Sequence, residues 1–486
     1  MLPVNNAEWP PREWRTVYDL YTEHAAWYSG DPANLLTVYA GKLTPFWSDM
    51  VKTERRVMLH VPVAGDIAAT SAAMLFSEHP RIQIPEAAEE NAPQDALDSQ
   101  VRLEEIIGDG NIYSKLLEAA EICSALGGVL IKVNWDRNLV DYPILSISQA
   151  DNALPEFRHG ILTGVTLWKE LPPLDDSSTV WRLFEEHQKG VIRSALYRGT
   201  AVNTGASVEF TAHPEAVGTP DVVITGIDDL VVRYIPNIRP HRRLRGWYLG
   251  QSDYSGSEGL MDSLDEAYTS LLRDIRLGVG RIIAPEEFFE FDTNKKLKFD
   301  VNREAYMALN TPVSATGANQ QITISQFDIR TEQHLAAIRD MLVQTFINAG
   351  YSPQSFGLDI AGNAESGTAL RVRERKSLIT TAKKAEYWRS AVEDILELMM
   401  QVDKLHLGGR VAPMRPRLEI QDSIQNDPAE TATSVELLNR ARAASKRVLV
   451  EMLHPDWTKA QIVAEVEEIK GEDGANVPDM FQAGVA

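Results

Sequence analysis

The segment Asn363–Ser377, NAESGTALRVRERKS, places a glycine and hydroxyl side chains directly before a basic helical pattern. Small residues before a helix can cradle a phosphate with backbone N–H groups, or expose a serine for nucleophilic attack. A phosphate loop closes with Lys followed by Ser or Thr at the helix start, whereas Thr368 is followed by Ala369 and Leu370. A catalytic serine needs a positioned histidine, and the sequence places none of its ten histidines beside Ser366. We therefore interpret Ser366 or Thr368 as a helix cap.

Positive charge is concentrated immediately after this glycine. Between Arg371 and Arg389 the chain carries seven Lys or Arg residues and two Glu, although its net charge is −21. Such a run is a solvated face, or it forms salt bridges to acidic neighbours in an oligomer, or it is a positive belt beside a polyanion. A second basic run, Arg239–Arg245, is interpreted first as a subunit contact and second as a nucleic-acid patch. The side chains expected to meet DNA or a neighbouring subunit are Arg371, Arg373, Arg375, Lys376, Lys383 and Lys384.

Composition limits the possible functions. The 486 residues are 44% hydrophobic and 24% charged, which is typical of a globular protein of about three domains. The negative charge argues against a protein that coats DNA, because coating requires many Lys and Arg on phosphates. The single cysteine, Cys123, lies in an apolar stretch and indicates a buried, inert thiol. No apolar run reaches the ~18 residues of a membrane helix, so we expect no membrane contact.

Motifs of the well-known catalytic and metal sites are missing from the sequence. It contains no HExxH, no CxxC pair, no phosphate loop and no GxSxG. We therefore expect no metal, no cofactor and no enzymatic activity.

Periodicity predicts an α+β fold. Residues 1–250 mix helical patterns with short β-like runs, such as 161–171 and 191–199, whose turns indicate antiparallel hairpins. Two helices of about 20 residues then flank a compact β-containing insert. A flexible, glycine-containing segment precedes the longest helical pattern in the chain, and the C-terminal region is mostly helical.

The order of these parts resembles one family over nearly the whole chain. The passage YIPNIRPHRRLRGWYLGQSDYSGSEGLMDSLDEAYTSLLRDIRLG, residues 234–278, resembles the segment that enters the stem in portal proteins of tailed double-stranded-DNA phages of the long non-contractile-tail type. SGTALRVRERK resembles the helix that follows the tunnel loop in that family. HVPVAGDIAATSAAMLF and SALGGVLIKVNWD are similar to its wing domain.

The resemblance implies a division of the chain into seven parts. These are a wing (1–256), a stem helix (257–280), a clip (281–329), a second stem helix (330–350), a tunnel loop (351–365), a long helix under the wing (366–404) and a helical crown (405–486). The tunnel loop would contain Gln354, Ser355, Gly357, Gly362 and Asn363, with few bulky or basic side chains for gripping DNA. The clip would carry the basic residues Lys295, Lys296 and Lys298.

The resemblance also implies a function. Portal proteins form a ring, typically of twelve subunits, at one capsid vertex, and the ring is the channel for DNA packaging and ejection. Expected partners are further copies of the chain, double-stranded DNA passing non-specifically, the terminase large subunit, a head–tail connector or adaptor, and the major capsid and scaffold proteins. The expected location is the virion, with assembly in the host cytoplasm. The alternative from another functional class is a nucleic-acid-processing enzyme that uses residues 366–376 as a phosphate site.

Overall fold

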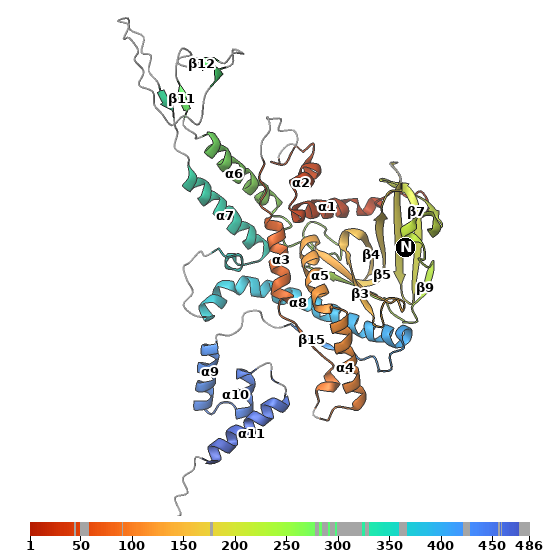
Figure 1. Ribbon diagram of the computed structural model, residues 1–486, viewed down its shortest axis with the longest axis vertical. Helices are drawn as coiled ribbons and strands as arrows, with labels where there is room; N and C mark the ends of the chain where they lie inside the picture. The colour runs from red at the N-terminus through yellow and green to blue at the C-terminus, as the bar shows by residue number, and fades with distance from the viewer. Residues whose placement is uncertain are drawn as a thin grey trace, which may run out of the picture. The chain divides into compact units, whose positions relative to one another are not determined.

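The computed structural model describes residues 1–42, 45–48, 58–89, 91–174, 178–277, 281–283, 290–291, 297–298, 323–325, 330–358, 367–420, 428–454, 457 and 459–475. Helices and strands both contribute to it, which confirms the predicted α+β class (Figure 1). The chain divides into two compact units. Unit 1 consists of Met1–Ser29, Val63–Ser255 and Phe346–Ala486, and unit 2 consists of Gly30–Pro62 and Gly256–Thr345.

The core of unit 1 is built from helices packed on a small antiparallel sheet. The helices are α1 (Arg15–Ser29), α3 (Val63–Phe76) and α5 (Ile112–Leu126), and the sheet has the order β10 (Val232–Pro236), β2 (Gly128–Asn134), β3 (Ile144–Gln149). The small side chains of α3, such as Ala68 and Ala72, allow it to pack closely on α5. Cys123 of α5 is fully buried, and burial raises the pKa of its thiol, as expected for an inert cysteine.

Helix α5 ends where the sequence predicted, at a glycine. Gly127 has a φ of +86°, and a Cβ there would lie 2.7 Å from the carbonyl oxygen of Gly250. Both the backbone conformation and the close approach therefore require glycine.

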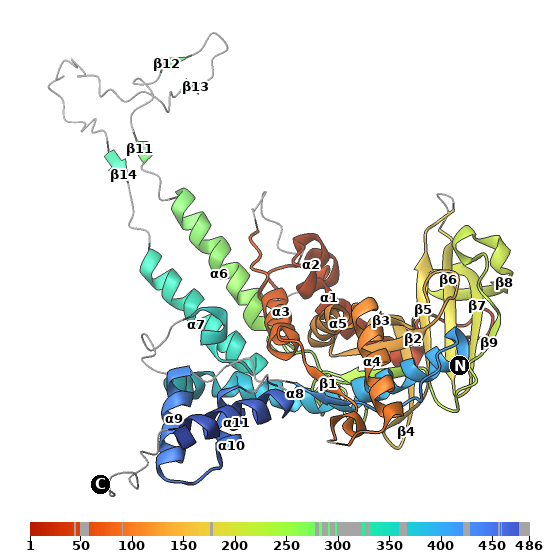
Figure 2. The ribbon, with the colours of Figure 1, turned by 60° about the horizontal axis from the view of Figure 1, so that its bottom comes forward.

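A second sheet of unit 1 lies beside this core (Figures 1 and 2). Its strands run antiparallel in the order β4 (Ala153–Arg158), β5 (Ile161–Leu171), β6 (Val180–Gln188), β7 (Val191–Thr200), β8 (Asn203–Val208), and β9 (Val222–Ile224) also pairs with β7. The long pairings of β5 with β6 and of β6 with β7 confirm the hairpins expected from the alternating runs.

The longest helix, α8 (Gly367–Val402), crosses unit 1 as one continuous element (Figures 1 and 2). Its 36 residues correspond to a length of about 54 Å. Its second half is part of the main core: Trp388 is buried and its ring meets Phe76 edge-on at 5.1 Å. A π-helical turn, Asp403–Leu407, follows and ends at Gly408.

Smaller elements complete unit 1. Helix α4 (Gln94–Asp109) packs on α5, and β1 (Arg81–Gln83) pairs with β15 (Arg417–Glu419). Three C-terminal helices follow: α9 (Pro428–Arg440), α10 (Lys446–Leu453) and α11 (Lys459–Ala475). Helices α10 and α11 enclose a small cluster that includes Val450, Ile462 and Val466, and α9 packs on α10. Their positions agree with the helical C-terminus predicted from the sequence.

Unit 2 contains α2 (Pro32–Tyr39), α6 (Glu258–Leu277) and most of α7 (Thr331–Ala349). Between α6 and α7, β11 (Arg281–Ile283) pairs with β14 (Thr323–Ser325), and β12 (Glu290–Phe291) pairs with β13 (Leu297–Lys298). His334 of α7 and Asp274 of α6 approach to 3.0 Å and tie the two helices together.

Residues 30–62 belong to unit 2, although the sequence pattern gave no reason to separate them from residues 1–256. Asp265 of α6 explains the grouping. Its buried carboxylate accepts hydrogen bonds from the indole N–H of Trp47 at 3.0 Å and the backbone N–H of Val61 at 2.9 Å, and lies 2.7 Å from Nδ1 of His60. One turn earlier, Asp262 accepts from the backbone N–H of Phe46.

Substitution of Asp265 by Ala is expected to destabilise unit 2 selectively. The change leaves the buried N–H groups of Trp47 and Val61 without their acceptor, at a cost of about 2–4 kcal/mol. Hydrogen exchange of α6 measures the loss. The exposed neighbour Glu266, changed to Ala, is the matched control and should stay within about 0.5 kcal/mol of wild type. Equal protection of α6 in both variants would contradict the role given to Asp265.

Candidate channel segment and its buried anchor

The candidate channel segment starts where α7 ends. Gly350 has a φ of +97°, and its carbonyl oxygen accepts a hydrogen bond of 2.6 Å from Oγ1 of Thr380 on α8. A Cβ at this position would lie 2.9 Å from the same Oγ1. Gly350 is therefore required both for its backbone conformation and for the close approach of the chain to α8.

The following residues, Tyr351–Leu358, are held on α8 rather than being free. The backbone N–H of Ser352 donates to Oγ of Ser377 at 2.8 Å, and the hydroxyl of Ser355 is 2.8 Å from the same atom. A short 3₁₀ helix, Pro353–Phe356, ends at Gly357 with a φ of +75°. The sequence predicted a flexible segment over 351–365, but within 351–358 the buried Ser377 supplies the partner that keeps the backbone ordered.

An aromatic contact completes this attachment. Phe356 stacks on Phe346, the residue with which α7 enters unit 1, with ring centroids 3.8 Å apart. Of the residues predicted for the tunnel loop, Gln354, Ser355 and Gly357 therefore lie in the attached part. Gly362 and Asn363 lie outside the described residues.

The basic side chains of α8 differ in their exposure to solvent. Arg375, Lys376 and Lys383 are exposed, and Arg373 is half-buried. Lys376 also donates to the carbonyl oxygen of Ile347 at the end of α7. The backbone of Arg371 lies in α8, but its side chain is outside the described part of the chain, as are Lys295, Lys296 and the side chain of Lys298.

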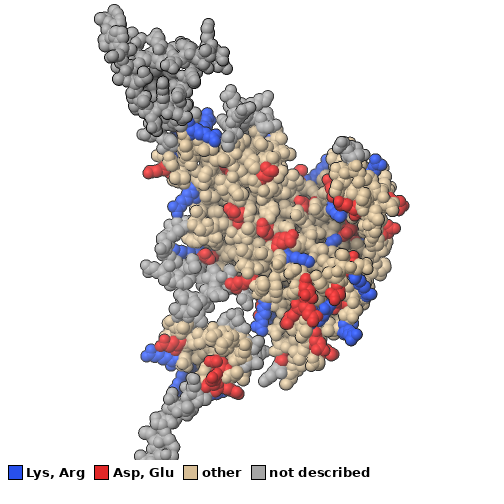
Figure 3. Space-filling view, viewed as in Figure 1, with Lys and Arg blue, Asp and Glu red and all other residues tan. Residues whose placement is uncertain are grey.

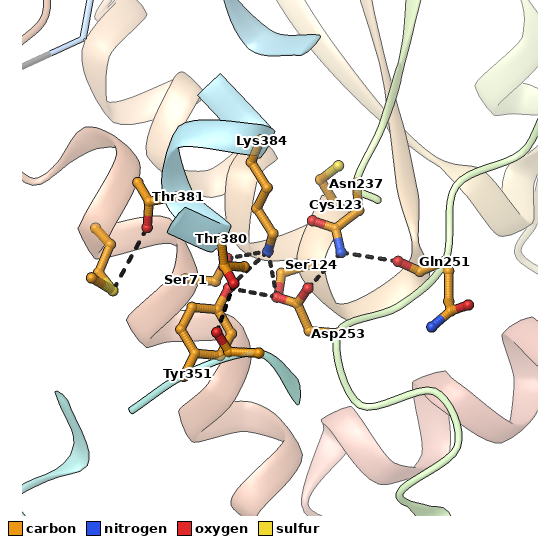
Figure 4. Close-up of polar contacts among 12 residues, drawn as sticks. Ser71, Cys123, Ser124, Asn237, Gln251, Asp253, Tyr351, Thr380, Thr381 and Lys384 are labelled. Atoms are coloured by element: carbon orange, nitrogen blue, oxygen red, sulfur yellow. Dashed lines mark hydrogen bonds and ion pairs between the residues drawn. The ribbon is translucent and has the colours of Figure 1, made fainter. Parts of the chain in front are cut away.

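Lys384 is a correction to the predicted set. Its side chain is only 1% exposed, so it cannot face a channel or a neighbouring subunit. Its ammonium group donates to Oδ2 of Asp253 at 2.5 Å, to Oγ of Ser71 at 2.6 Å and to the hydroxyl of Tyr351 at 2.8 Å (Figure 4). The lysine next to the exposed Lys383 is thus turned into the core.

Asp253 is the other half of this buried cluster, and both of its oxygens are used. Oδ2 also accepts from the hydroxyls of Ser124 and Tyr351, and Oδ1 accepts from the amide of Asn237 at 2.8 Å. Burial, and after it the Asp253 carboxylate, raises the pKa of Tyr351, so the phenol stays protonated and donates. We call these six residues the buried anchor: Ser71, Ser124, Asn237, Asp253, Tyr351 and Lys384.

The second basic run, Arg239–Arg245, forms a surface loop of unit 1. Arg239 lies over the ring of Tyr248 at 5.3 Å and borders an open cavity of about 500 Å³ that Trp247 and Tyr387 also line. Arg243 lies 3.6 Å from Glu23 of α1. Part of this run is therefore engaged with its own chain.

No group of three His, Cys, Asp or Glu side chains among the described residues is arranged to hold a metal ion. Within the same residues, no helix is both long and apolar enough to span a membrane.

Comparison with known proteins identifies the family. Residues 242–479 match the family model described as phage portal protein, SPP1 Gp6-like. The chain belongs to the phage portal family. The match contains α6, α7, the channel segment, α8 and the C-terminal helices. The portal chain therefore has a capsid role in a tailed phage and works within a multi-subunit assembly.

Two further comparisons add little to this assignment. A search of curated proteins gives no match. Among solved structures, a chain from the virion of a native gene transfer agent particle aligns over 92% of the portal chain and 96% of its own length. Its sequence identity is 12% and its TM-score is 0.40, a likeness too distant to support an argument.

Replacing Lys384 with Met tests the buried anchor. The change leaves the Asp253 carboxylate buried without its counter-charge, and we expect the free energy of unfolding of unit 1 to fall by about 3–5 kcal/mol. Chemical denaturation followed by tryptophan fluorescence measures the loss. Lys383→Met, one residue away and exposed, is the matched control and should change stability by less than about 0.5 kcal/mol.

A double variant distinguishes an ion pair from simple packing. Asp253→Asn combined with Lys384→Met should cost less than the sum of the two single changes, because the charges are removed together. Additive losses, or equal unfolding midpoints for the two lysine variants, would show that the pair does not stabilise the fold.

Proposed function

We propose that the portal chain forms a ring, of twelve copies, at one vertex of the capsid, and that the ring is the channel for DNA packaging and ejection. The family match over residues 242–479 is the observation that carries this proposal. In the same proposal, residues 1–256 are the wing, 257–280 and 330–350 the stem helices, 281–329 the clip, 351–365 the tunnel loop, 366–404 the long helix and 405–486 the crown.

The charge of the chain suits passage of DNA rather than retention. Each copy carries a net charge of −21, so a ring of many copies repels phosphates overall. DNA bound through many lysines and arginines would be held by an electrostatic term that is independent of sequence. A DNA duplex moves through the ring more easily when the channel wall attracts it only weakly or repels it, because strong binding would hold it in place. The attached part of the channel segment, Tyr351–Leu358, contains no Lys or Arg, which agrees with this requirement.

The energy for packaging comes from a partner in this proposal. The ring docks the terminase large subunit during packaging, and a head–tail connector or adaptor afterwards. The major capsid and scaffold proteins surround it while the particle assembles in the host cytoplasm. The alternative, an enzyme with a phosphate site at residues 366–376, gains no support from the described residues.

The expected result for the purified chain is a ring with a central channel. Its mass should be close to twelve times the 54.1 kDa of one copy, measured by native mass spectrometry and by electron microscopy of negatively stained particles. A chain that remains a monomer at all concentrations and salt conditions would contradict the proposal. Calorimetric titration with ATP should give no binding, whereas saturable binding would revive the enzymatic alternative.

A further inference from the structure

The exposed face of α8 is not purely basic. Val372 is 69% exposed and Ile379 is 46% exposed, and Ile379 follows Val372 by seven positions, which corresponds to about two helical turns. Arg375, Lys376 and Lys383 are exposed beside them at three- and four-residue spacings, so these side chains share one face. We call this set, Val372, Arg375, Lys376, Ile379 and Lys383, the basic stripe.

The exposed Val372 and Ile379 of this stripe indicate whether its partner is DNA or protein. Contacts to a DNA backbone are made by charged and hydrogen-bonding groups, and they leave exposed Val and Ile side chains without a role. A protein partner buries such side chains at the centre of an interface and places charges around them. The basic stripe therefore has the composition of a protein-binding helix.

A stripe of similar composition and opposite charge lies on α4. Leu97 is 39% exposed and Val101 is 57% exposed, one turn apart, and the exposed carboxylates of Asp98, Glu104 and Glu105 lie on the same face. Figure 3 shows acidic side chains gathered in the lower part of the view, where Figure 1 draws α4. We call Leu97, Asp98, Val101, Glu104 and Glu105 the acidic stripe.

The two stripes of one copy cannot reach each other. Arg102 of α4, next to the acidic stripe, donates to Glu105 at 2.9 Å and to Asp403 at 2.8 Å, and Asp403 directly follows the C-terminal end of α8. Ile379 precedes Asp403 by 24 residues of almost uninterrupted helix, which corresponds to roughly 36 Å. Because α8 is continuous and its second half is buried in the core, this separation is fixed.

We propose that the basic stripe of α8 binds the acidic stripe of α4 on a second copy of the chain. This inference rests on the proposed ring, and it identifies one contact between neighbouring subunits of that ring. Two different surfaces meeting head to tail form a heterologous interface, and repetition of such an interface closes into a ring when the rotation permits. The opposite charges of the two stripes select the partner surface and align the two helices. Val372 and Ile379 of one copy and Leu97 and Val101 of the other supply the apolar surface that becomes buried.

The test is an exchange of charge between the stripes. Lys376→Glu with Lys383→Glu should reduce ring assembly, because acidic side chains then face the acidic stripe. Asp98→Lys with Glu104→Lys should reduce it as well. In each case we expect the chain concentration for half-assembly to rise at least about tenfold, measured by mass photometry. All four changes in one chain should restore assembly to within about threefold of wild type.

Control variants separate this contact from general effects of charge. Glu209→Lys with Glu215→Lys makes the same change in net charge as the α4 reversals, at exposed positions of unit 1 outside both stripes, and should assemble as wild type does. Ile379→Ser should weaken assembly without changing the thermal unfolding midpoint of the monomer, because the side chain is exposed there. A circular dichroism spectrum of each variant confirms that it is folded.

Two results would overturn the inference. If the lysine reversals leave ring assembly intact but reduce DNA packaging in assembled particles, the basic stripe faces DNA. If all four changes together fail to restore assembly in a folded chain, α4 is not the counterpart. In both cases the wild-type ring remains, so the proposed function stands. A wild-type chain that forms no ring would instead remove the proposed function and this contact together.

Discussion

The buried ion pair between Lys384 and Asp253 is the interaction on which the rest of unit 1 depends. Removing two charges from water is costly unless every polar atom finds a partner. The ammonium group uses its three hydrogens on Asp253, Ser71 and Tyr351, and the carboxylate also accepts from Ser124 and Asn237 (Figure 4). Because a partly satisfied network would be worse than an apolar core, the segments that carry these residues must be in place together.

The buried anchor also explains how unit 1 can accommodate a long insertion. The chain leaves unit 1 after Ser255 and returns to it at Phe346. Asp253 precedes Ser255 by two residues and Tyr351 follows Phe346 by five, and the two side chains are joined by a hydrogen bond of 2.9 Å. The ends of the insertion are thus fixed within unit 1 itself, by contacts that unit 2 does not supply. Loop-closure entropy rises only slowly with length, so such a junction tolerates insertions of different sizes.

Local patterns account for what could be predicted from the sequence. Period-two runs identified the hairpins of β5, β6 and β7, a glycine marked the end of α5, and apolar spacing located α6, α7 and α8. The buried anchor could not be found in this way. Lys383 and Lys384 look equivalent in a sequence, and only the rotation of about 100° per residue separates a solvent-facing position from a core position. The partner of Lys384, Asp253, is 131 residues away, and no local signal connects the two.

The same reasoning explains the grouping of residues 30–62. Their attachment to α6 depends on Asp265, which lies more than 200 residues later in the chain and accepts hydrogen bonds from Trp47 and Val61. A pattern read over short windows assigns Asp262 and Asp265 to the acidic first turns of a helix, where carboxylates are common. Only the fold shows that they receive N–H groups from another segment.

Helix α8 has a buried polar side and an exposed basic side on one continuous element. On its inner side Lys384 and Ser377 hold the channel segment and the buried anchor, and on its outer side Val372 and Ile379 lie among basic residues. The positive charge that the sequence displays as one run is therefore divided by helix geometry. One lysine neutralises a buried carboxylate, and the others remain on the surface. Since both sides belong to one unbroken helix, a subunit bound to the outer side, as we propose, would be held at a fixed distance from the channel segment on the inner side. In the proposed ring, the same element would set both the assembly contact and the position of the channel wall.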